Sequence, residues 1–153
     1  MNTALLDAVH LAQTGQSELA RELLGELWKT LPLDDFFHRC VLAHYMADLQ
    51  TDPNGELHWD QLALNAALAG PRESFVGRVP DVTLDTILPS LHLNLASSYE
   101  RTHTLASARR HAGLALAAAE YLPATPLGET TRAAILRLSA RLGVHAESSV
   151  RKS

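Results

Sequence analysis

Three side chains that could together bind a metal ion follow one another at steps of four residues: Cys40, His44 and Asp48. On a helix this spacing places them along one face, and thiolate, imidazole and carboxylate are all zinc ligands. The three residues lie on consecutive turns of one helix, and usually only two of three such turns reach one ion. Another helix would have to supply further ligands, such as His58 or His92. No spacing motif supports that addition. The pattern favours a buried cysteine beside a surface His–Asp pair, and a metal-dependent enzyme using the three residues is the weakest hypothesis.

The remaining side chains capable of catalysis do not fall into known catalytic spacings. The eight histidines are scattered, and none belongs to a His-Glu-x-x-His zinc helix. The sequence has neither a Gly-rich phosphate loop nor a nucleophile elbow, and no base is placed by sequence beside Ser97 and Ser98. We therefore expect a protein that is not an enzyme and that needs no cofactor.

The basic side chains gather in two groups that could contact an acidic partner or a nucleic acid. These are Arg101 with Arg109, Arg110 and His111, and a stripe of Arg132, Arg137 and Arg141. The net charge of −4 and the 5% of aromatic residues provide neither a broad positive field nor stacking platforms for bases. We interpret both groups as solvated faces and do not expect a nucleic acid as partner.

The sequence also favours one cellular compartment. The segment Met1 to Asp7 lacks the basic region of a signal peptide, and no uncharged stretch approaches the roughly 20 apolar residues of a membrane span. Cys40 is the single cysteine, so no intramolecular disulfide can form. These features predict a protein of the reducing cytoplasm with no membrane partner.

Composition and periodicity predict an all-α fold. Of the 153 residues, 46% are hydrophobic and 20% are charged, which is typical of a single globular domain. Leu and Ala recur at steps of three and four, the helical period. Seven antiparallel helices are expected, at about 3–13, 17–31, 34–50, 56–68, a fifth ending near 102, 105–121 and 130–142.

Three boundaries stay open or depend on single residues. Gly70 to Pro80 contains two Gly and two Pro and is expected to be a long loop, either functional or partly disordered. The fifth helix starts near Leu88, with Pro89 in its first turn, or is preceded by an additional turn from Val82 that leads into a kink at Pro89. The second helix is expected to start near Ser17, with Ser17 as its N-cap. The last helix is expected to end at Gly143, before a frayed tail at 147–153.

Two of the expected helical hairpins can be aligned on each other. Superimposing Gly15 on His103 places Ala20 on Ala108, Leu24 on Ala112, and Leu27 on Ala115. The best-matched positions are Leu95, Ala96, Tyr99, Ala108 and Ala115, then Gly15, Ala20 and Pro32, with Leu42, Ala43 and Met46 in the middle hairpin. This pattern resembles the tetratricopeptide repeat. It departs from that family in having no early Trp, in Ala112 where the family has an aromatic residue, and in the long connection after the middle hairpin.

The resemblance implies a right-handed superhelix over residues 1–146. Its hairpins would lie at about 3–32, 34–69 and 88–122, with a capping helix at 130–142. The alternative is a generic bundle of Ala- and Leu-rich helices. Both arrangements predict the same helices and differ in whether the array curves.

The resemblance also implies where a ligand would bind. Repeats of this family bind peptides on a concave surface lined by the first helix of each hairpin, and Asn94 falls where many members have a backbone-binding Asn. The further residues expected on that surface are Gln13, Cys40, His44, Asp48, Ser97 and Arg101. The two-Lys carboxylate clamp of some members is not present. No metal ligand is assigned.

These observations lead to one main functional expectation and one alternative. The main expectation is a protein–protein interaction module that binds a peptide or a partner helix in a concave groove. The alternative is a self-associating scaffold protein, a homodimer formed through the Ala-rich sixth and last helices.

Overall fold

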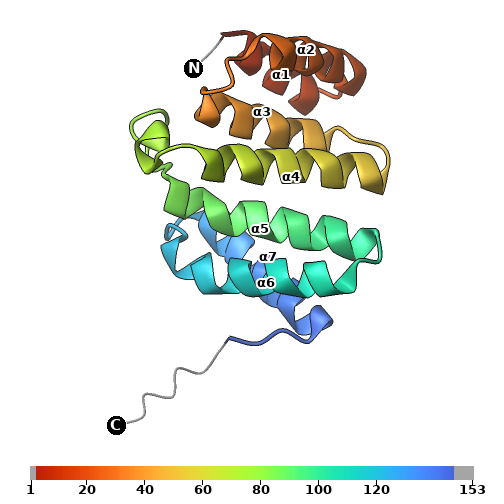
Figure 1. Ribbon diagram of the computed structural model, residues 1–153, viewed down its shortest axis with the longest axis vertical. Helices are drawn as coiled ribbons and strands as arrows, with labels where there is room; N and C mark the ends of the chain where they lie inside the picture. Colours follow the sequence, from red (N-terminus) through yellow and green to blue (C-terminus); the bar gives the residue numbers. More distant parts are fainter. Residues whose placement is uncertain (1–2, 147–153) are drawn as a thin grey trace. The chain divides into compact units, whose positions relative to one another are not determined.

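The computed structural model describes residues 3–146, and this part of the chain consists of seven α-helices and two short 3-10 helices without any strand (Figure 1). The all-α prediction is therefore confirmed. The chain forms two compact units, unit 1 (Met1–Leu84) and unit 2 (Asp85–Ser153), which are described separately. The superhelix and the assignment of residues 1–146 to one domain stay predictions, and the tail at 147–153 lies outside the described residues.

Unit 1 is built from two helical hairpins followed by a short 3-10 helix. Its elements are α1 (Thr3–Gln13), α2 (Ser17–Thr30), α3 (Phe36–Asp48), α4 (Pro53–Ala69) and η1 (Arg72–Phe75). Figure 1 shows α1 beside α2 and α3 beside α4. Leucines and small residues at the helical period fill the core, which contains Leu5, Ala8, Leu24, Leu42 and Met46. Trp28 meets Trp59 edge to face at its margin, with ring centroids 5.2 Å apart.

The long segment from Gly70 to Pro80 has a defined course and belongs to the core of unit 1. Residues Arg72–Phe75 form η1, and the Phe75 side chain is completely buried. Its ring packs edge-on against Phe37 of α3, with centroids 5.6 Å apart. A single aromatic residue thus fastens the segment to α3, because burying a phenyl ring removes a large apolar area from water.

Two helices begin earlier than expected for the same reason. The predicted starts near Glu56 and Thr130 are wrong, because α4 begins at Pro53 and α7 (Pro126–Leu142) begins at Pro126. In both helices a capping side chain precedes the proline, and it accepts a hydrogen bond from a backbone N–H in the first turn. Proline suits a first helical position, where its missing N–H leaves no hydrogen bond unmade. Ser17 is also corrected, since it is the first residue of α2 and Gln16 is the N-cap.

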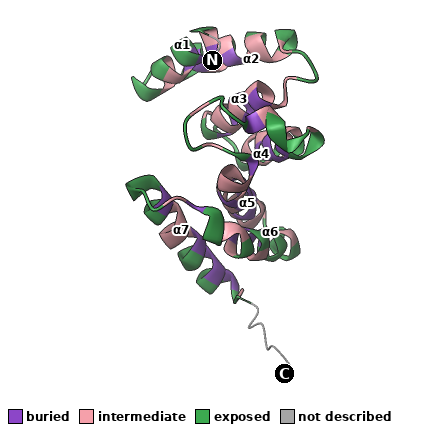
Figure 2. Ribbon diagram, turned by 90° about the vertical axis from the view of Figure 1, so that its left-hand side faces the viewer, coloured by how far each residue is buried: buried purple, intermediate pink, exposed green. Residues whose placement is uncertain are grey.

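Unit 2 contains three α-helices and one 3-10 helix within its described residues. These are α5 (Leu84–Arg101), α6 (Leu105–Ala118), η2 (Ala119–Tyr121) and α7. A start of α5 at Leu88 is wrong, because the helix includes the turn before Pro89 and continues through it. Two clusters of its core join small residues of α5 and α6 to larger residues further along the chain, namely Ala96, Ala108, Ala112, Ala115, Leu122, Ile135, Leu138 and Leu142. Leu91 and Leu95 of α5 are buried as well. Figure 2 shows buried residues on one side of α7 and exposed residues on the other.

The turns of the first and third hairpins have the same conformation. Gly15 and His103 both adopt a positive φ, 83° and 59°. Gln16 N donates to Leu11 O over 2.9 Å, and Thr104 N donates to Tyr99 O over 2.8 Å, which is the Schellman pattern of helix ends. The aligned Ala20 and Ala108 are both completely buried. Gly143 ends α7 with a φ of 70°, as predicted.

None of the helices in the described residues is both long enough and apolar enough to cross a membrane.

Candidate functional site

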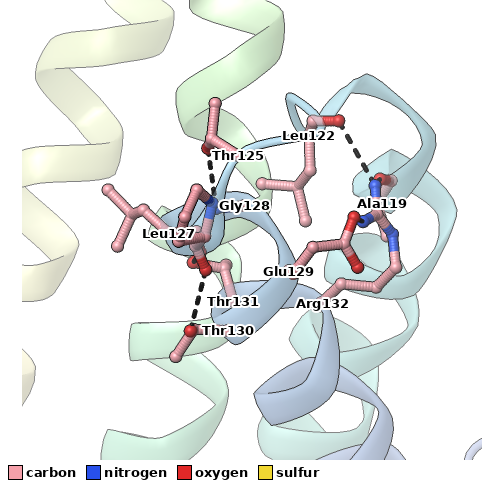
Figure 3. Close-up of polar contacts among 10 residues, drawn as sticks. Ala119, Leu122, Thr125, Leu127, Gly128, Glu129, Thr130, Thr131 and Arg132 are labelled. Carbon is pink, nitrogen blue, oxygen red and sulfur yellow. Dashed lines mark hydrogen bonds and ion pairs between the residues drawn. The ribbon is translucent and has the colours of Figure 1, made fainter.

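The start of α7 is fixed by polar contacts to the segment that precedes it (Figure 3). The Thr125 hydroxyl accepts a hydrogen bond of 3.1 Å from Gly128 N, which satisfies one of the free N–H groups of the first turn. The Arg132 guanidinium donates to the carbonyl oxygens of Ala119 and Leu122, both at 3.2 Å, and to the Glu129 carboxylate at 2.7 Å. Arg132 therefore closes the end of α6 and η2 and is not available to a ligand.

Two arginines hold the other end of α7. Arg109 of α6 donates from Nε to the Leu142 carbonyl oxygen over 3.1 Å, which satisfies an open carbonyl at the helix end. Arg141 of α7 binds Glu100 of α5 through two parallel hydrogen bonds of 2.8 Å. Together with the contacts at its start, these bonds set the position of α7 against α5 and α6.

A groove of about 270 Å³ lies between α5 and α7 in unit 2. Its lining combines apolar side chains with polar and charged groups, and consists of Leu93, Asn94, Ser97, Ala134, Arg137, Leu138 and Arg141. Leu138 belongs to the core cluster that contains Ala96 and Ala112, and the partly buried Leu93 packs against that cluster. The groove therefore has an apolar base joined to the core and polar groups from both helices, which is the usual composition of a ligand site.

The charged groups at the groove are unequally paired. Hydrogen bonding from Arg141 lowers the pKa of Glu100, and the same contact raises the pKa of Arg141, so both are ionised at neutral pH. Arg137 is exposed, and within residues 3–146 the structure gives it no hydrogen bond or ion pair. Unit 2 contains eight Arg or Lys and five Asp or Glu, whereas unit 1 contains five and twelve. The groove thus presents a cation, Arg137, that is unpaired within residues 3–146 and belongs to the basic part of an acidic chain.

Two of the expected ligand-binding residues line this groove. Asn94 and Ser97 both lie on the wall formed by α5. Arg101, at the end of the same helix, is exposed and donates from Nη2 to the Ser98 hydroxyl over 3.3 Å. It is not among the residues that line the groove, although its charge helps to lower the pKa of Glu100.

The expected residues of unit 1 do not form a comparable site. Gln13 is exposed at the end of α1. Cys40 is only 2% exposed, so it offers almost no surface to a ligand, and burial raises the pKa of its thiol to about 12. His44 Nε2 and Asp48 Oδ2 lie 4.0 Å apart on the surface of α3. Zinc binds the thiolate form of cysteine, so the environment of Cys40 opposes the metal-site hypothesis. Among the described residues no group of three metal-ligating side chains comes together.

A buried histidine pair in unit 2 was not expected from the sequence. His92 of α5 and His111 of α6 are 9% and 6% exposed, and their Nδ1 atoms lie 3.0 Å apart. One ring must donate the Nδ1 proton and the other must accept it. Tyr99 stacks on His111 at a centroid distance of 5.5 Å. Burial lowers the pKa of both imidazoles, with added repulsion from Arg110, and brings the pKa of His92 to about 4.

The sequence pattern predicts that Arg132, Arg137 and Arg141 form one solvated stripe. The structure separates them, because Arg132 binds backbone carbonyls while the other two line the groove. The spacing of Ala134, Arg137 and Arg141 on one helical face could have indicated this, as could a count of charges on either side of residue 84.

The structure also changes the basis of the homodimer alternative. Ala108, Ala112 and Ala115, the small residues of α6 that suggested a close helix contact between two copies, are at most 1% exposed. They are buried within unit 2 by residues of α5 and α7, including Ala96, Leu138 and Ile135. They cannot also contact a second copy.

Comparison of the chain with protein-family models, with curated proteins and with solved structures gives no match.

Proposed function

We propose that this chain is a protein-interaction module whose unit 2 binds a peptide or an exposed segment of a partner in the groove between α5 and α7. The observation that carries the proposal is the groove itself, which is lined by Asn94 and Ser97 of α5, by Arg137 and Arg141 of α7, and by apolar side chains of both helices. Amide, hydroxyl and guanidinium groups can hydrogen-bond a polypeptide backbone and its side chains, while Leu93 and Leu138 contact its apolar parts.

A groove of this size admits a few residues of a partner and not a whole protein surface. About 270 Å³ is slightly below the roughly 300–1,000 Å³ typical of ligand pockets. The interaction is therefore expected to be that of a short segment with modest affinity. The proposal needs no cofactor and assigns no catalytic residue.

Site-specific photo-crosslinking of the full chain in native lysate tests this function. A photoreactive amino acid at Ser97 is expected to give a discrete crosslinked partner. The matched control carries the same amino acid at Asn65, an exposed residue of α4. A third position, His44 of α3, tests the ligand-binding surface expected in unit 1. Equal crosslinking from Ser97 and Asn65, or a partner captured only from His44, would contradict the assignment of the groove.

Sedimentation velocity over a range of concentrations separates this function from the homodimer alternative. A module that binds a different polypeptide stays monomeric at all concentrations. Concentration-dependent growth of the sedimentation coefficient that is abolished by Ser97→Trp would instead make a second copy of this chain the occupant of the groove.

A further inference from the structure

We infer that the segment bound in the α5–α7 groove is acidic, that its carboxylates bind Arg137 and Arg141, and that Glu100 is a built-in competitor for Arg141. This inference rests on the proposed function and names the chemistry of its partner.

The Glu100–Arg141 pair shows what kind of group Arg141 binds. Both carboxylate oxygens accept hydrogen bonds of 2.8 Å, one from Nε and one from Nη2 of the guanidinium. This two-point arrangement is selective for planar anions such as carboxylates. Because Arg141 also lines the groove, a carboxylate from a bound peptide would meet the same donor group that Glu100 now occupies.

The pair is exposed enough to be exchanged. The Arg141 and Glu100 side chains are 57% and 26% exposed, and an ion pair in such a position contributes little because water screens it. A partner carboxylate that binds Arg141 must displace the Glu100 carboxylate, and this competition lowers the affinity for the partner by about fivefold or less. Glu100 thus tunes binding without blocking it.

Arg137 provides a cation that needs no exchange. It lies one helical turn before Arg141 on the face of α7 that borders the groove, and among the described residues it has no ion-pair partner. A single acidic side chain can bind it directly, and a second one can compete for Arg141. An acidic segment with carboxylates on neighbouring residues therefore complements the groove better than a neutral one.

The charge of each unit favours the same partner. Unit 2 carries a formal charge of +3 and unit 1 of −7, as counted from their Arg, Lys, Asp and Glu residues. An acidic segment is consequently attracted to unit 2 and repelled by unit 1, which directs it to the groove. Nucleic acid is also acidic, but among the residues that the structure describes no aromatic side chain lines the groove to stack on a base.

Fluorescence anisotropy with the full chain and synthetic peptides tests this inference. The probes are a short labelled peptide in which Glu and Ser alternate, the same peptide with Gln for Glu, and a labelled oligouridylate. We expect the Glu peptide alone to bind, and we expect its affinity to fall between low salt and about 0.15 M salt. Equal affinity for the Glu and Gln peptides, absence of binding to the Glu peptide, or tighter binding of the oligouridylate would overturn the inference.

Three variants locate the binding. Arg137→Gln is expected to weaken binding of the Glu peptide by about threefold to fivefold, since it removes an exposed cation whose pairing with a carboxylate is screened by water. The matched control Arg110→Gln removes an exposed arginine of α6 and should change the affinity less than about twofold. Glu100→Gln should strengthen binding by about threefold to fivefold because it frees Arg141. Circular dichroism checks that each variant keeps its helices.

The outcomes separate this inference from the function on which it rests. If Arg137→Gln and Arg110→Gln weaken binding equally, the peptide responds to net charge and not to the groove, and the inference fails. If Ser97 crosslinks a partner that Arg137→Gln still binds with unchanged affinity, the groove is an interaction site but its partner is not acidic. If Ser97 crosslinks nothing, the proposed function itself fails.

Discussion

Acid should destabilise unit 2 through the buried pair of His92 and His111. The pKa of His92 falls from 6.5 to about 4 in the folded chain, first because burial disfavours its charged form and then because His111 and Arg110 repel a proton. The unfolded chain therefore binds more protons than the folded chain between these two pH values. Stability is fully present above pH 6.5 and is lost as the pH falls toward 4.

The size of the effect follows from the shift in pKa. A pKa that moves by one on the pH scale changes the free energy of unfolding by about 1.4 kcal/mol. The change at His92 alone is therefore worth at most about 3 kcal/mol between pH 6.5 and pH 4. The pKa of His111 is lowered as well, again mainly by burial. The two rings titrate as a coupled pair, because the proton on one Nδ1 is shared with the other over 3.0 Å.

The assay must report on unit 2. Both tryptophans, Trp28 and Trp59, lie in unit 1, so their fluorescence does not follow α5 and α6. Hydrogen exchange measured by mass spectrometry on peptides from these two helices, at several pH values and corrected for the intrinsic exchange rate, gives the free energy of local opening. Proton NMR of the imidazole rings gives the two pKa values directly.

A substitution isolates the contribution of the pair. His92→Gln removes one titratable group but keeps a side chain that can hydrogen-bond His111. It should reduce the loss of opening free energy of α5 and α6 between pH 6.5 and pH 4 by about 2–3 kcal/mol. His145→Gln, which removes an exposed histidine of unit 2, should leave the loss unchanged. An identical pH dependence in wild type and His92→Gln would refute the reasoning.

Three further predictions concern stability. Phe75→Ala should lower the free energy of unfolding of unit 1 by about 3–5 kcal/mol, measured by urea titration with Trp fluorescence, because its ring is completely buried; a loss below about 1 kcal/mol would contradict its anchoring role. Because both positions have positive φ, His103→Gly should stabilise unit 2 by about 1 kcal/mol and Gly15→Ala should destabilise unit 1 by a similar amount. Hydrogen exchange of α6 should show the gain in unit 2, and Trp fluorescence should show the loss in unit 1. Ala112→Leu should lower the opening free energy of α6, measured by hydrogen exchange, by about 1–3 kcal/mol, since Ala112 is 1% exposed. The control Ala117→Leu, at an exposed position, should change it by less than about 0.5 kcal/mol, and similar effects of both variants would mean that α6 is not packed between α5 and α7.

The helices themselves could be predicted because their signals are local. Leu and Ala at steps of three and four define each helical face, and the turn at Gly15 and the end at Gly143 require a positive φ that glycine readily adopts. His103 shows the limit of this reasoning, since it adopts the same conformation as Gly15 without being glycine. The alignment of these two positions in sequence nevertheless matched two turns with the same hydrogen-bond pattern.

The candidate site could be predicted only in part because it depends on contacts between helices. Asn94 and Ser97 can be predicted from their positions on one helix. Arg137 and Arg141, which line the same groove, lie on α7, and no local pattern shows that α7 packs against α5. The histidine pair joins residues separated by 19 positions in the chain, and neither ring belongs to a spacing motif. Cys40 could be expected to be buried, since a lone cysteine on an apolar face commonly behaves as a small hydrophobic residue.

The small alanines of α6 help to explain why Arg137 of α7 lies at the groove without an ion-pair partner among the described residues. Ala108 and Ala112 let α5 and α7 approach α6 closely, so that Leu138 and Leu142 of α7 reach Ala96 of α5 through the same cluster. With its apolar face used inside unit 2, α7 turns Arg137 and Arg141 toward the groove. Arg141 finds Glu100 there, but α5 supplies no second acidic side chain to the lining, and Arg137 is left without a counter-ion among the described residues. A helix stripe that alone would be a solvated face thus becomes one wall of the groove, and we propose that a carboxylate from another polypeptide binds there.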